Sequence, residues 1–472
     1  MIILNTSLNK LSNEKSLRQD FDYHCYRQNT ANDSYSFNDI FEIMLVSKIN
    51  LDEIPDCFSY CEIGDVDKNG FASAQRLNKA ERNLLNENYF SKIANGDIIS
   101  VKKDDILLSK VRPNLKKFVR VTEANCDTYF TSAFIRLKPK IIPVIIYYCL
   151  RNHFFEAIMS ISRQGKGYPT INEKDIVELK FSKSIIDSLC AQQEKLTREI
   201  IQIENQIEQL NSSITPIKHI IDSILQQRFD LNYNKFNDVV QISDFTASLM
   251  SFSNNPDLRF STKFHRPAGE YVKQELNRIT TKKFKHFLAE PIILGASISP
   301  SDYDENGDYQ YLSMATIKNW EFDNENAQYV SAAYSASKSE KTIKRGDIIL
   351  ARSGEGTIGK VALIEKEDVK AVFADFTMRI RLKNYNPKFA YYYMRSTYFQ
   401  YLIKIYKKGL GNNTNIFPIV IREFPLPDVS LEEQQRIVDE IQEEIDKQNN
   451  IRKQIALLRE QIDGIIENTI VQ

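Results

Sequence analysis

The stretch that decides the fold occurs twice. Residues 147–151 read Tyr-Tyr-Cys-Leu-Arg, and residues 391–395 read Tyr-Tyr-Tyr-Met-Arg, at a shift of 244 positions. The same shift pairs further residues downstream: Phe155 with Phe399, Gly165 with Gly409, Gly167 with Gly411, and Thr170 with Thr414. A constant shift that includes aromatic and glycine positions indicates an internal repeat rather than chance similarity.

The repeat extends in both directions from this stretch. Upstream, residues 105–108 (Asp-Ile-Leu-Leu) match residues 347–350 (Asp-Ile-Ile-Leu) at a shift of 242. Downstream, Gln192-Gln193 matches Gln434-Gln435 at the same shift. The 472-residue chain is therefore predicted to be a tandem duplication, each copy a globular domain followed by a helix.

Each copy ends in a run of apolar residues spaced alternately by four and three positions. The first run comprises Leu196, Ile200, Ile203, Ile207, Leu210, Ile214, Ile217, Ile221 and Ile224. The second comprises Val438, Ile441, Ile445, Ile451, Ile455, Leu458, Ile462 and Ile465, with Gln448 on the same seam and Ile451 one step early. This spacing predicts two long helices with narrow apolar stripes, which can pair as an intramolecular antiparallel coiled coil.

Two residues qualify these helices. Pro216 lies inside the first pattern, where the loss of one backbone bond predicts a kink rather than a break. Ser430 precedes the second helix as an N-cap, and Glu433 three residues later completes a capping box.

The globular parts combine short β-like runs with helical stretches. The β-like runs are 106–108, 134–137, 348–351, 361–364 and 378–382, and the helical stretches lie near 143–160 and 387–405. The predicted fold class is therefore α+β. The predicted boundaries are domain 1 at 1–185, a central helix at 186–229, domain 2 at 230–428 and a terminal helix at 429–472.

Composition limits the possible settings of this chain. Lys and Arg total 62, balanced by 62 Asp and Glu, so any nucleic-acid site must be a local patch on a neutral body. Six cysteines without a regular framework, and no signal-peptide-like start, favour a reducing cytoplasm. No apolar run is long enough to span a membrane.

The glycine-rich run 354–360 (Gly-Glu-Gly-Thr-Ile-Gly-Lys) resembles a nucleotide-binding loop. Such loops require a helix directly after the last glycine, whereas Lys360 is followed by the β-like run 361–364. Val361 also stands where a phosphate loop needs a hydroxyl for Mg²⁺. A hairpin loop that presents its backbone and Arg352 is the favoured interpretation. The sequence shows neither metal-ligand spacing nor a catalytic triad, so we expect no catalysis and no metal or cofactor in this chain.

Basic and amide-rich loops recur at equivalent positions of the two copies. In the first copy they contain Lys110, Arg112, Asn114, Lys116, Lys117, Arg163, Gln164, Lys166 and Tyr168. In the second they contain Arg352, Ser353, Thr357, Lys360, Lys407, Lys408, Asn412, Asn413 and Thr414. Lys and Arg neutralise phosphates, and Arg, Asn and Gln can pair with base edges, so these residues are the candidate DNA contacts.

The chain resembles the specificity (S) subunit of type I restriction–modification enzymes along most of its length. The features that carry this resemblance are 346–353 (GDIILARS), 409–415 (GLGNNTN), 425–438 (PLPDVSLEEQQRIV), 103–114 (KDDILLSKVRPN) and the domain–helix–domain–helix plan. The resemblance implies two target-recognition domains with pseudo-two-fold internal repetition, each of which reads one half of a bipartite double-stranded DNA target.

The same resemblance implies partners for the helices. They would set the spacing between the half-sites and dock two methyltransferase subunits, which carry S-adenosylmethionine. A restriction and translocation subunit would use ATP and Mg²⁺. Two alternatives remain open: an enzyme that binds nucleotide at 354–360, and a coiled-coil scaffold that joins two protein-binding domains.

Overall fold

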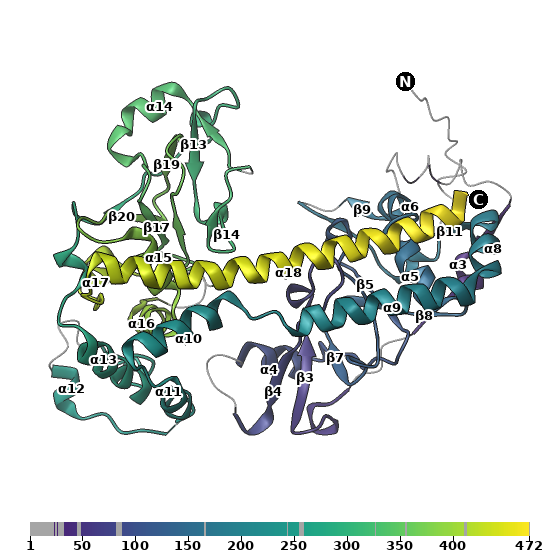
Figure 1. Ribbon diagram of the computed structural model, residues 1–472, viewed down its shortest axis with the longest axis horizontal. Coiled ribbons are helices and arrows are strands. Elements are labelled where there is room, and N and C mark those ends of the chain that lie inside the picture. The colour runs from purple at the N-terminus through teal and green to yellow at the C-terminus, as the bar shows by residue number, and fades with distance from the viewer. Residues whose placement is uncertain are drawn as a thin grey trace. The chain divides into compact units, whose positions relative to one another are not determined.

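The computed structural model describes two compact units, traced in Figure 1. It describes Tyr23, Tyr26 and residues 33–44, 49–81, 87–164, 167–242, 244–253, 259–325, 327–354, 356–409 and 413–471. Unit 1 comprises residues 1–213 and 451–472, and unit 2 comprises residues 214–450. The chain passes from one unit to the other after residue 213 and again after residue 450. This division does not test the domain and helix boundaries inferred from the sequence, which remain predictions.

Unit 1 alternates short strands with short helices and ends in a long helix. Its first elements are β1 (Ser34–Ser36), α3 (Phe37–Ile40), β2 (Phe41–Ile43), β3 (Cys57–Cys61), β4 (Gln75–Asn78), α4 (Glu87–Ala94), β5 (Ile106–Ser109), β6 (Phe118–Arg120), β7 (Thr128–Phe130) and β8 (Phe134–Pro139). Then follow α5 (Pro143–Arg151), α6 (Phe155–Ile161), β9 (Arg163–Gln164), β10 (Pro169–Thr170), α7 (Glu173–Ile176), β11 (Lys180–Ser182), α8 (Lys183–Ala191) and α9 (Gln193–Ser212).

Unit 2 begins with helices and continues with strands. Its elements up to the central strands are α10 (Ile217–Phe229), α11 (Tyr233–Val240), α12 (Leu249–Ser253), α13 (Pro267–Ile279), β12 (Ile293–Leu294), β13 (Tyr309–Leu312), β14 (Ile317–Lys318), β15 (Glu321–Phe322), β16 (Tyr329–Val330) and α14 (Ala332–Ser337). The remainder are β17 (Ile348–Ala351), β18 (Val361–Leu363), β19 (Ala371–Phe373), β20 (Thr377–Ile380), α15 (Pro387–Arg395), α16 (Thr397–Tyr406) and α17 (Pro418–Ile421). The last helix, α18 (Leu431–Val471), contributes residues to both units.

The two units share one strand order. A four-stranded sheet has the order β2-β8-β5-β6 in unit 1 and β12-β20-β17-β18 in unit 2, with antiparallel neighbours throughout. A three-stranded sheet has the order β4-β3-β7 in unit 1 and β16-β13-β19 in unit 2, with the last pair parallel in each. This agreement between the two strand orders is the result that a tandem duplication predicts. The mixture of helices and mainly antiparallel strands confirms the α+β class.

The repeated Asp-Ile-Leu-Leu run forms the central strand of the larger sheet. Every residue of β5 and of β17 is buried, so the apolar run lies between covered faces. The aspartate before each strand closes the same turn: Asp105 accepts a hydrogen bond from Lys102 N at 2.7 Å, and Asp347 accepts one from Lys344 N at 2.8 Å.

The repeated Tyr-Tyr helix anchors the body of each unit to a long helix. In unit 1 the Tyr147 hydroxyl donates to Phe118 O on β6 at 3.0 Å, whereas Tyr148 donates to Glu204 on α9 at 2.9 Å. In unit 2 the Tyr392 hydroxyl donates to Gln442 on α18 at 2.9 Å. The sequence repeat therefore preserves a contact between body and helix.

The expectation of one kinked helix through Pro216 is wrong. Helix α9 ends at Ser212 and α10 begins at Ile217, with Pro216 as its N-cap. The intervening Thr215 N donates to the Oε1 of Gln448 on α18 at 2.8 Å, so a side chain satisfies a backbone group that the helix no longer satisfies. The terminal helix is confirmed, because α18 is continuous from 431 to 471.

The stripes of both long helices are largely buried. Leu196, Ile200, Ile203 and Ile207 of α9 are buried in unit 1. In unit 2, residues of α10 and of α18 belong to one core cluster, among them Ile221, Ile224, Val438 and Ile441. This burial agrees with the predicted apolar seam, while the pairing of the helices as a coiled coil remains a prediction.

Candidate nucleic-acid interface

In unit 1 the structure brings together the two loops that the sequence singled out. The chain that leaves β5 runs beside the β9–β10 hairpin: Arg112 N donates to Pro169 O, and Ile171 N donates to Lys110 O, each at 2.9 Å. Val111 and Thr170 form an antiparallel bridge between these two hydrogen bonds. Candidate residues more than 50 positions apart in the sequence thus share one surface region.

Unit 2 repeats this arrangement. The chain that leaves β17 pairs with the segment after α16, through a bridge between Ser353 and Asn415. Ile416 N donates to Arg352 O at 2.9 Å, and Gly354 N donates to Thr414 O at 3.3 Å. Both copies therefore present a double loop built from the end of the central strand and the segment after the second helix.

Several candidate cations of unit 1 are held by partners in the same unit. Lys110 Nζ lies 2.8 Å from Glu173 Oε1, and Arg163 pairs with the buried Asp175 carboxylate through Nε at 2.8 Å. Lys117 donates to Ile63 O at 2.8 Å. These three side chains stabilise the loops, and sequence reasoning missed the carboxylates that engage two of them.

Other candidates in unit 1 face solvent. Arg112, Asn114 and Tyr168 are exposed, and the guanidinium carbon of Arg112 lies 5.1 Å from the centre of the Tyr168 ring. Lys116 is half-buried, with Nζ 4.3 Å from the centre of the Phe155 ring. Lys166 and the side chain of Gln164 lie outside the described residues.

The sequence-based expectation that Arg352 is presented by its loop is wrong. Its side chain is half-buried, because Nε donates to Asp375 O at 2.8 Å and an Nη atom donates to Asn415 Oδ1 at 3.3 Å. The guanidinium joins the loop after β17 to the neighbouring segments. Arg352 therefore positions the double loop of unit 2.

Two hydroxyl candidates of unit 2, those of Ser353 and Thr357, also hold this loop together. Ser353 and Thr414 are buried, and Ser353 Oγ donates to Thr414 O at 3.1 Å. Thr357 Oγ1 donates to Ser353 O at 2.8 Å, across the turn. These hydrogen bonds favour a supporting role for the Ser353 and Thr357 hydroxyls, whereas Thr414 Oγ1 is buried without a hydrogen-bond partner among the described residues.

The remaining candidates of unit 2 lie at the edge of the double loop. Asn413 is exposed, while Lys360, Lys407 and Lys408 are half-buried. Asn412 lies outside the described residues. Whether any candidate contacts DNA stays a prediction.

Sequence reasoning missed Arg259 as a positioning residue. Its guanidinium donates to Ile405 O, Tyr406 O and Lys407 O, the last at 2.8 Å, and so satisfies carbonyl groups at the end of α16. A sequence signal was available, because Leu-Arg occurs at 17–18 and again at 258–259, a shift of 241 positions close to those of the repeat.

The glycine-rich run 354–360 forms the hairpin between β17 and β18, as the β-like run after Lys360 predicted. Strands β17 and β18 are paired in antiparallel register on either side of it, and β18 begins at Val361. A phosphate-binding loop would continue into a helix whose N-terminal amides face the phosphate. This geometry removes the structural basis for the nucleotide-binding alternative.

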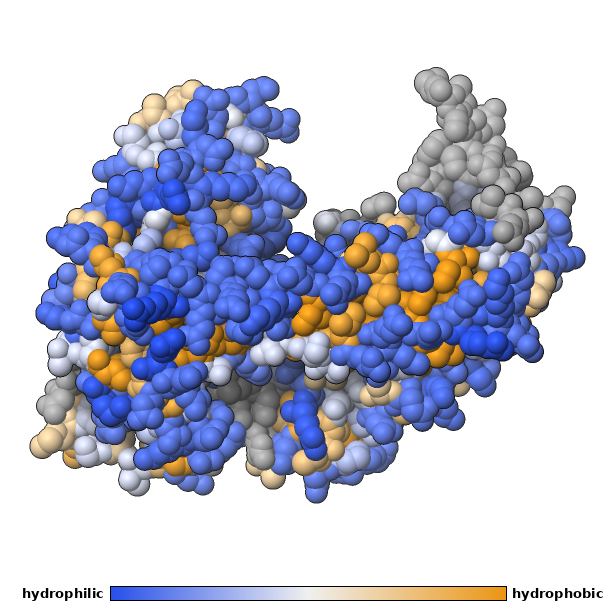
Figure 2. Space-filling model, viewed as in Figure 1, coloured by the Kyte–Doolittle hydropathy of each residue, from blue (hydrophilic) through white to orange (hydrophobic). Residues whose placement is uncertain are grey.

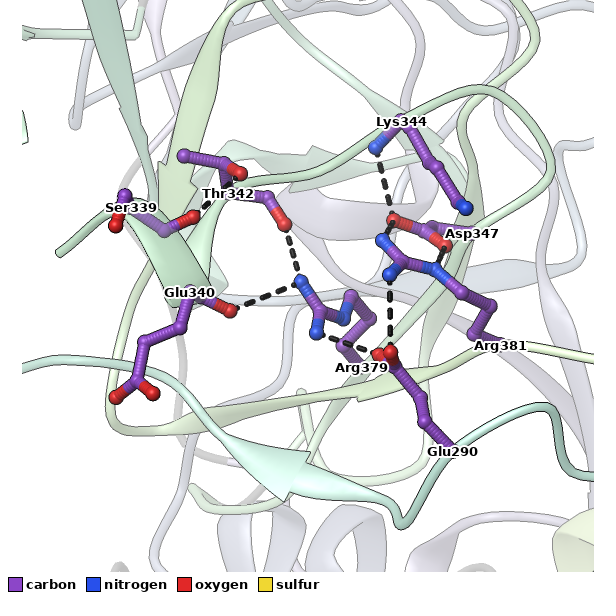
Figure 3. Close-up of polar contacts among 8 residues, drawn as sticks. All are labelled: Glu290, Ser339, Glu340, Thr342, Lys344, Asp347, Arg379 and Arg381. Atoms are coloured by element: carbon purple, nitrogen blue, oxygen red, sulfur yellow. Dashed lines mark hydrogen bonds and ion pairs between the residues drawn. The ribbon is translucent and has the colours of Figure 1, made fainter.

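An ion-pair cluster braces the strand from which this hairpin leaves (Figure 3). Asp347 is fully buried and accepts two hydrogen bonds from Arg381, at 2.6 and 2.7 Å. Glu290 accepts from Arg379 at 2.5 Å and from Arg381 at 3.1 Å. The hydrogen bond to Asp347 raises the pKa of Arg381, so the guanidinium stays charged. The cluster fixes the start of β17, and hence the place of the double loop.

A cavity of about 720 Å³ in unit 1 adjoins the loop 110–117, with Asn114 and Lys116 on its wall. Arg151 lines it as well, and three carbonyls hold its guanidinium: Lys68 O at 2.7 Å, Lys116 O at 2.8 Å and Phe118 O at 3.2 Å. Within the described part of the chain no cluster of His, Cys, Asp or Glu could hold a metal ion. Across the same residues no helix is both long and apolar enough to cross a membrane.

Comparison with known proteins identifies a family over part of the chain. Residues 288–458 match the family described as the type I restriction modification DNA specificity domain. This match spans β12 to β20, helices α15 to α17 and the first part of α18. No curated protein sequence matches the chain.

Three solved structures resemble the chain at low identity. The crystal structure of the HsdS subunit from Thermoanaerobacter tengcongensis is 12% identical, with a TM-score of 0.30 over 93% of this chain and 96% of that one. The type I restriction-modification S subunit from M. genitalium is 12% identical, with a TM-score of 0.39 over 93% and 96% of the two chains. A chain from a study of assembly and conformational transition in the type I R-M system is 14% identical, with a TM-score of 0.35 over 93% and 97%. These TM-scores are low, so the likeness to the three structures supports no inference about this chain. The family match and the shared strand order of the two units carry that weight.

Proposed function

We propose that this chain, which matches the type I restriction modification DNA specificity domain at residues 288–458, is a non-catalytic specificity protein and that each of its two units reads one half of a bipartite DNA target. One observation carries the proposal. The family match lies mostly in unit 2, yet unit 1 has the same strand order and the same double loop. Two copies of one recognition surface in one chain suit a target with two half-sites.

The double loops supply the chemistry for such a target. Exposed Arg112 and Asn114 in unit 1, and exposed Asn413 in unit 2, carry donors suited to base edges and phosphates. Hydrogen bonds within each loop fix these positions before DNA arrives, which lowers the entropic cost of ordering on binding. The neutral net charge of the chain agrees with local rather than general affinity for DNA.

The long helices are proposed to pair as an antiparallel coiled coil that sets the gap between the half-sites and docks two methyltransferase subunits. Figure 2 shows apolar side chains gathered over α9 and the C-terminal part of α18. A groove there is lined by Leu210, Leu457 and Leu458, and Leu457 is 65% exposed. An exposed apolar groove on unit 1 is a suitable surface for a partner subunit.

The proposal assigns the chemistry to the partners. The methyltransferase subunits would hold S-adenosylmethionine and methylate adenine, and restriction or translocase subunits would use ATP and Mg²⁺. This chain would hold no cofactor itself and would act in the cytoplasm, where the host DNA lies.

A binding experiment with the reconstituted methyltransferase complex tests this function. Host genomic fragments are selected on the complex, and their affinity is compared with that of random duplexes over a range of salt concentrations. We expect a selected bipartite sequence, and an affinity that falls steeply with salt because phosphate contacts release counterions. Equal affinity for selected and random DNA would contradict the proposal, and salt-insensitive binding would favour a protein scaffold instead.

The spacing role has a separate test. Seven residues are inserted into α18 near residue 450, and seven into α9 near residue 209. A seven-residue helical insertion adds about 10 Å, so the non-specific gap should lengthen while both half-sites keep their sequences. An altered half-site, or an unchanged gap, would contradict the spacing role.

A further inference from the structure

The geometry of unit 1 points to a specific base contact: we propose that Arg112, held on the ring of Tyr168, reads a guanine in the half-site recognised by unit 1. This inference rests on the proposed function and adds to it the identity of one reading residue and of its base. It follows from the backbone at Arg112, from the engagement of the neighbouring cations, and from the contrast with unit 2.

The backbone holds Arg112 in a fixed and unusual conformation. Its φ is 52° and its ψ 53°, in the left-handed region, and Pro113 follows directly. Non-glycine residues occupy this region at a cost, and the residue before a proline normally prefers an extended backbone. The Arg112 N–H donates to Pro169 O at 2.9 Å, which ties the strained residue to the β9–β10 hairpin. The side chain therefore leaves a point that both loops fix.

The guanidinium of Arg112 remains available for DNA. Lys110, Lys117 and Arg163 are occupied by a carboxylate or a carbonyl in the same unit. Among the described residues, by contrast, Arg112 forms no ion pair. Its guanidinium carbon lies 5.1 Å from the centre of the Tyr168 ring. A contact with an aromatic ring engages no oxygen acceptor, so the N–H donors of Arg112 remain for another partner.

A planar, pre-oriented guanidinium is suited to guanine. Arginine pairs bidentately with O6 and N7 of guanine in the major groove, which is the commonest specific contact between protein and DNA. Tyr168 is 43% exposed, so the stacked pair stands at the surface of the double loop, and the ring reduces the freedom that Arg112 would lose on binding. Lysine could replace the charge but not the fork of donors.

Unit 2 has no counterpart to this contact. The bridge between Val111 and Thr170 corresponds to the bridge between Ser353 and Asn415, so the position after the bridge is Arg112 in unit 1 and Gly354 in unit 2. Glycine offers no side chain. The guanine contact is therefore confined to one half-site, and substitutions at Arg112 should leave the other half-site unchanged.

The test maps adenine methylation in a host that expresses the full complex with R112K, R112A, Y168F or Y168A. Lys138→Ala, which removes an exposed cation from β8 of the same unit, serves as the matched control. In R112K and R112A, the preference for guanine at one position of one half-site should fall by about 5- to 150-fold, the range for a good bidentate contact. Y168A should weaken the same preference, whereas Y168F and K138A should retain the wild-type motif.

Three results separate the possible failures. Uniformly weaker methylation by R112K or R112A with an unchanged motif would show a phosphate contact and overturn the inference. A change in both half-sites, or at a base other than guanine, would overturn it as well. If the wild-type complex yields no bipartite motif, the proposed function itself fails. Thermal melts that match the wild type establish that R112A and Y168A are folded, and R112K preserves the charge independently.

Discussion

The hydroxyl of Tyr148 on α5 donates a hydrogen bond to Glu204 on α9 at 2.9 Å, and the same carboxylate pairs with Arg120 at the end of β6. Burial, with Glu204 nearby, raises the pKa of Tyr148 well above its usual value, so the hydroxyl remains a donor at physiological pH. Helix α9 is thus fixed to β6, the strand that follows the loop 110–117, and to α5, the helix before α6. If α9 helps to set the spacing between half-sites, this contact transmits that spacing to the reading surface.

Removing the carboxylate should loosen α9. The Arg120 side chain is only 8% exposed, and in E204Q it keeps Asp104 as its charged partner. We expect a loss of about 2–3 kcal/mol, below the roughly 3–5 kcal/mol for breaking a fully buried pair, and about 1 kcal/mol for Y148F. Hydrogen exchange of α9 peptides measures both effects, and unchanged exchange in E204Q would contradict them.

The buried carboxylate at the start of β17 should be among the most sensitive positions of unit 2. D347N removes the charge that faces the half-buried guanidinium of Arg381 and leaves Glu290 as its remaining charged partner. The expected loss is about 2–3 kcal/mol, because Arg381 keeps a second carboxylate as its partner. Glu290, which is 34% exposed, provides the control, because E290Q should cost clearly less. Equal urea midpoints for the two variants would refute this ranking.

The start of the terminal helix depends on Ser430. Its Oγ accepts the hydrogen bond of Glu433 N at 3.2 Å, which confirms the N-cap that the sequence predicted. S430A should destabilise the helix start by about 1 kcal/mol, whereas S430D should retain most of the stability because Asp also accepts this bond. The exchange rates of amides 431–434 give the measurement, and equal rates in the two variants would argue against capping.

The surface carboxylate of Glu423, which pairs with two lysines, should give a pH-dependent stability. Hydrogen bonds from Lys285 and Lys283 lower the pKa of Glu423 from 4.5 to about 2. Because the folded-state pKa is depressed, the stabilisation is complete above pH 4.5 and disappears as the pH falls toward 2. The difference in melting temperature between wild type and E423Q should therefore shrink between pH 6 and pH 3. The effect should be small, since water and salt screen exposed pairs, and a difference independent of pH would exclude it.

The sequence predicted the parts of the fold that local pattern and repetition determine. The run Ile348–Ala351 became β17 with the predicted bounds, because four consecutive apolar residues suit a strand covered on both faces. The run after Lys360 identified 354–360 as a hairpin rather than a phosphate loop. The spacing of apolar residues located the terminal helix, and Ser430 located its start.

The break before α10 could not be predicted from apolar spacing. The stripe continues through Ile214 and Ile217 in sequence, although the backbone between them is not helical. The break is stabilised by Gln448, whose side chain accepts from Thr215 N across more than 200 residues of sequence. The sequence shows Gln448 only as a polar residue on an apolar seam.

The candidate site was predicted as loops rather than as side chains. Repetition identified the correct pairs of segments, but the roles of individual residues depend on distances that a sequence does not show. Two carboxylates follow the β9–β10 hairpin closely in sequence. Glu173 pairs with Lys110, and Asp175 pairs with Arg163. Arg352, expected at the surface, instead ties segments together.

The most direct test of the central claim is single-molecule sequencing of methylated adenines in a host that depends on this chain for its specificity. The account predicts one bipartite motif, two fixed half-sites separated by a gap of constant length, which disappears when the chain is deleted. Exchange of unit 1 for that of a relative with a different motif should replace one half-site alone. A methylation pattern unchanged by deletion, or a continuous motif without a gap, would contradict the account.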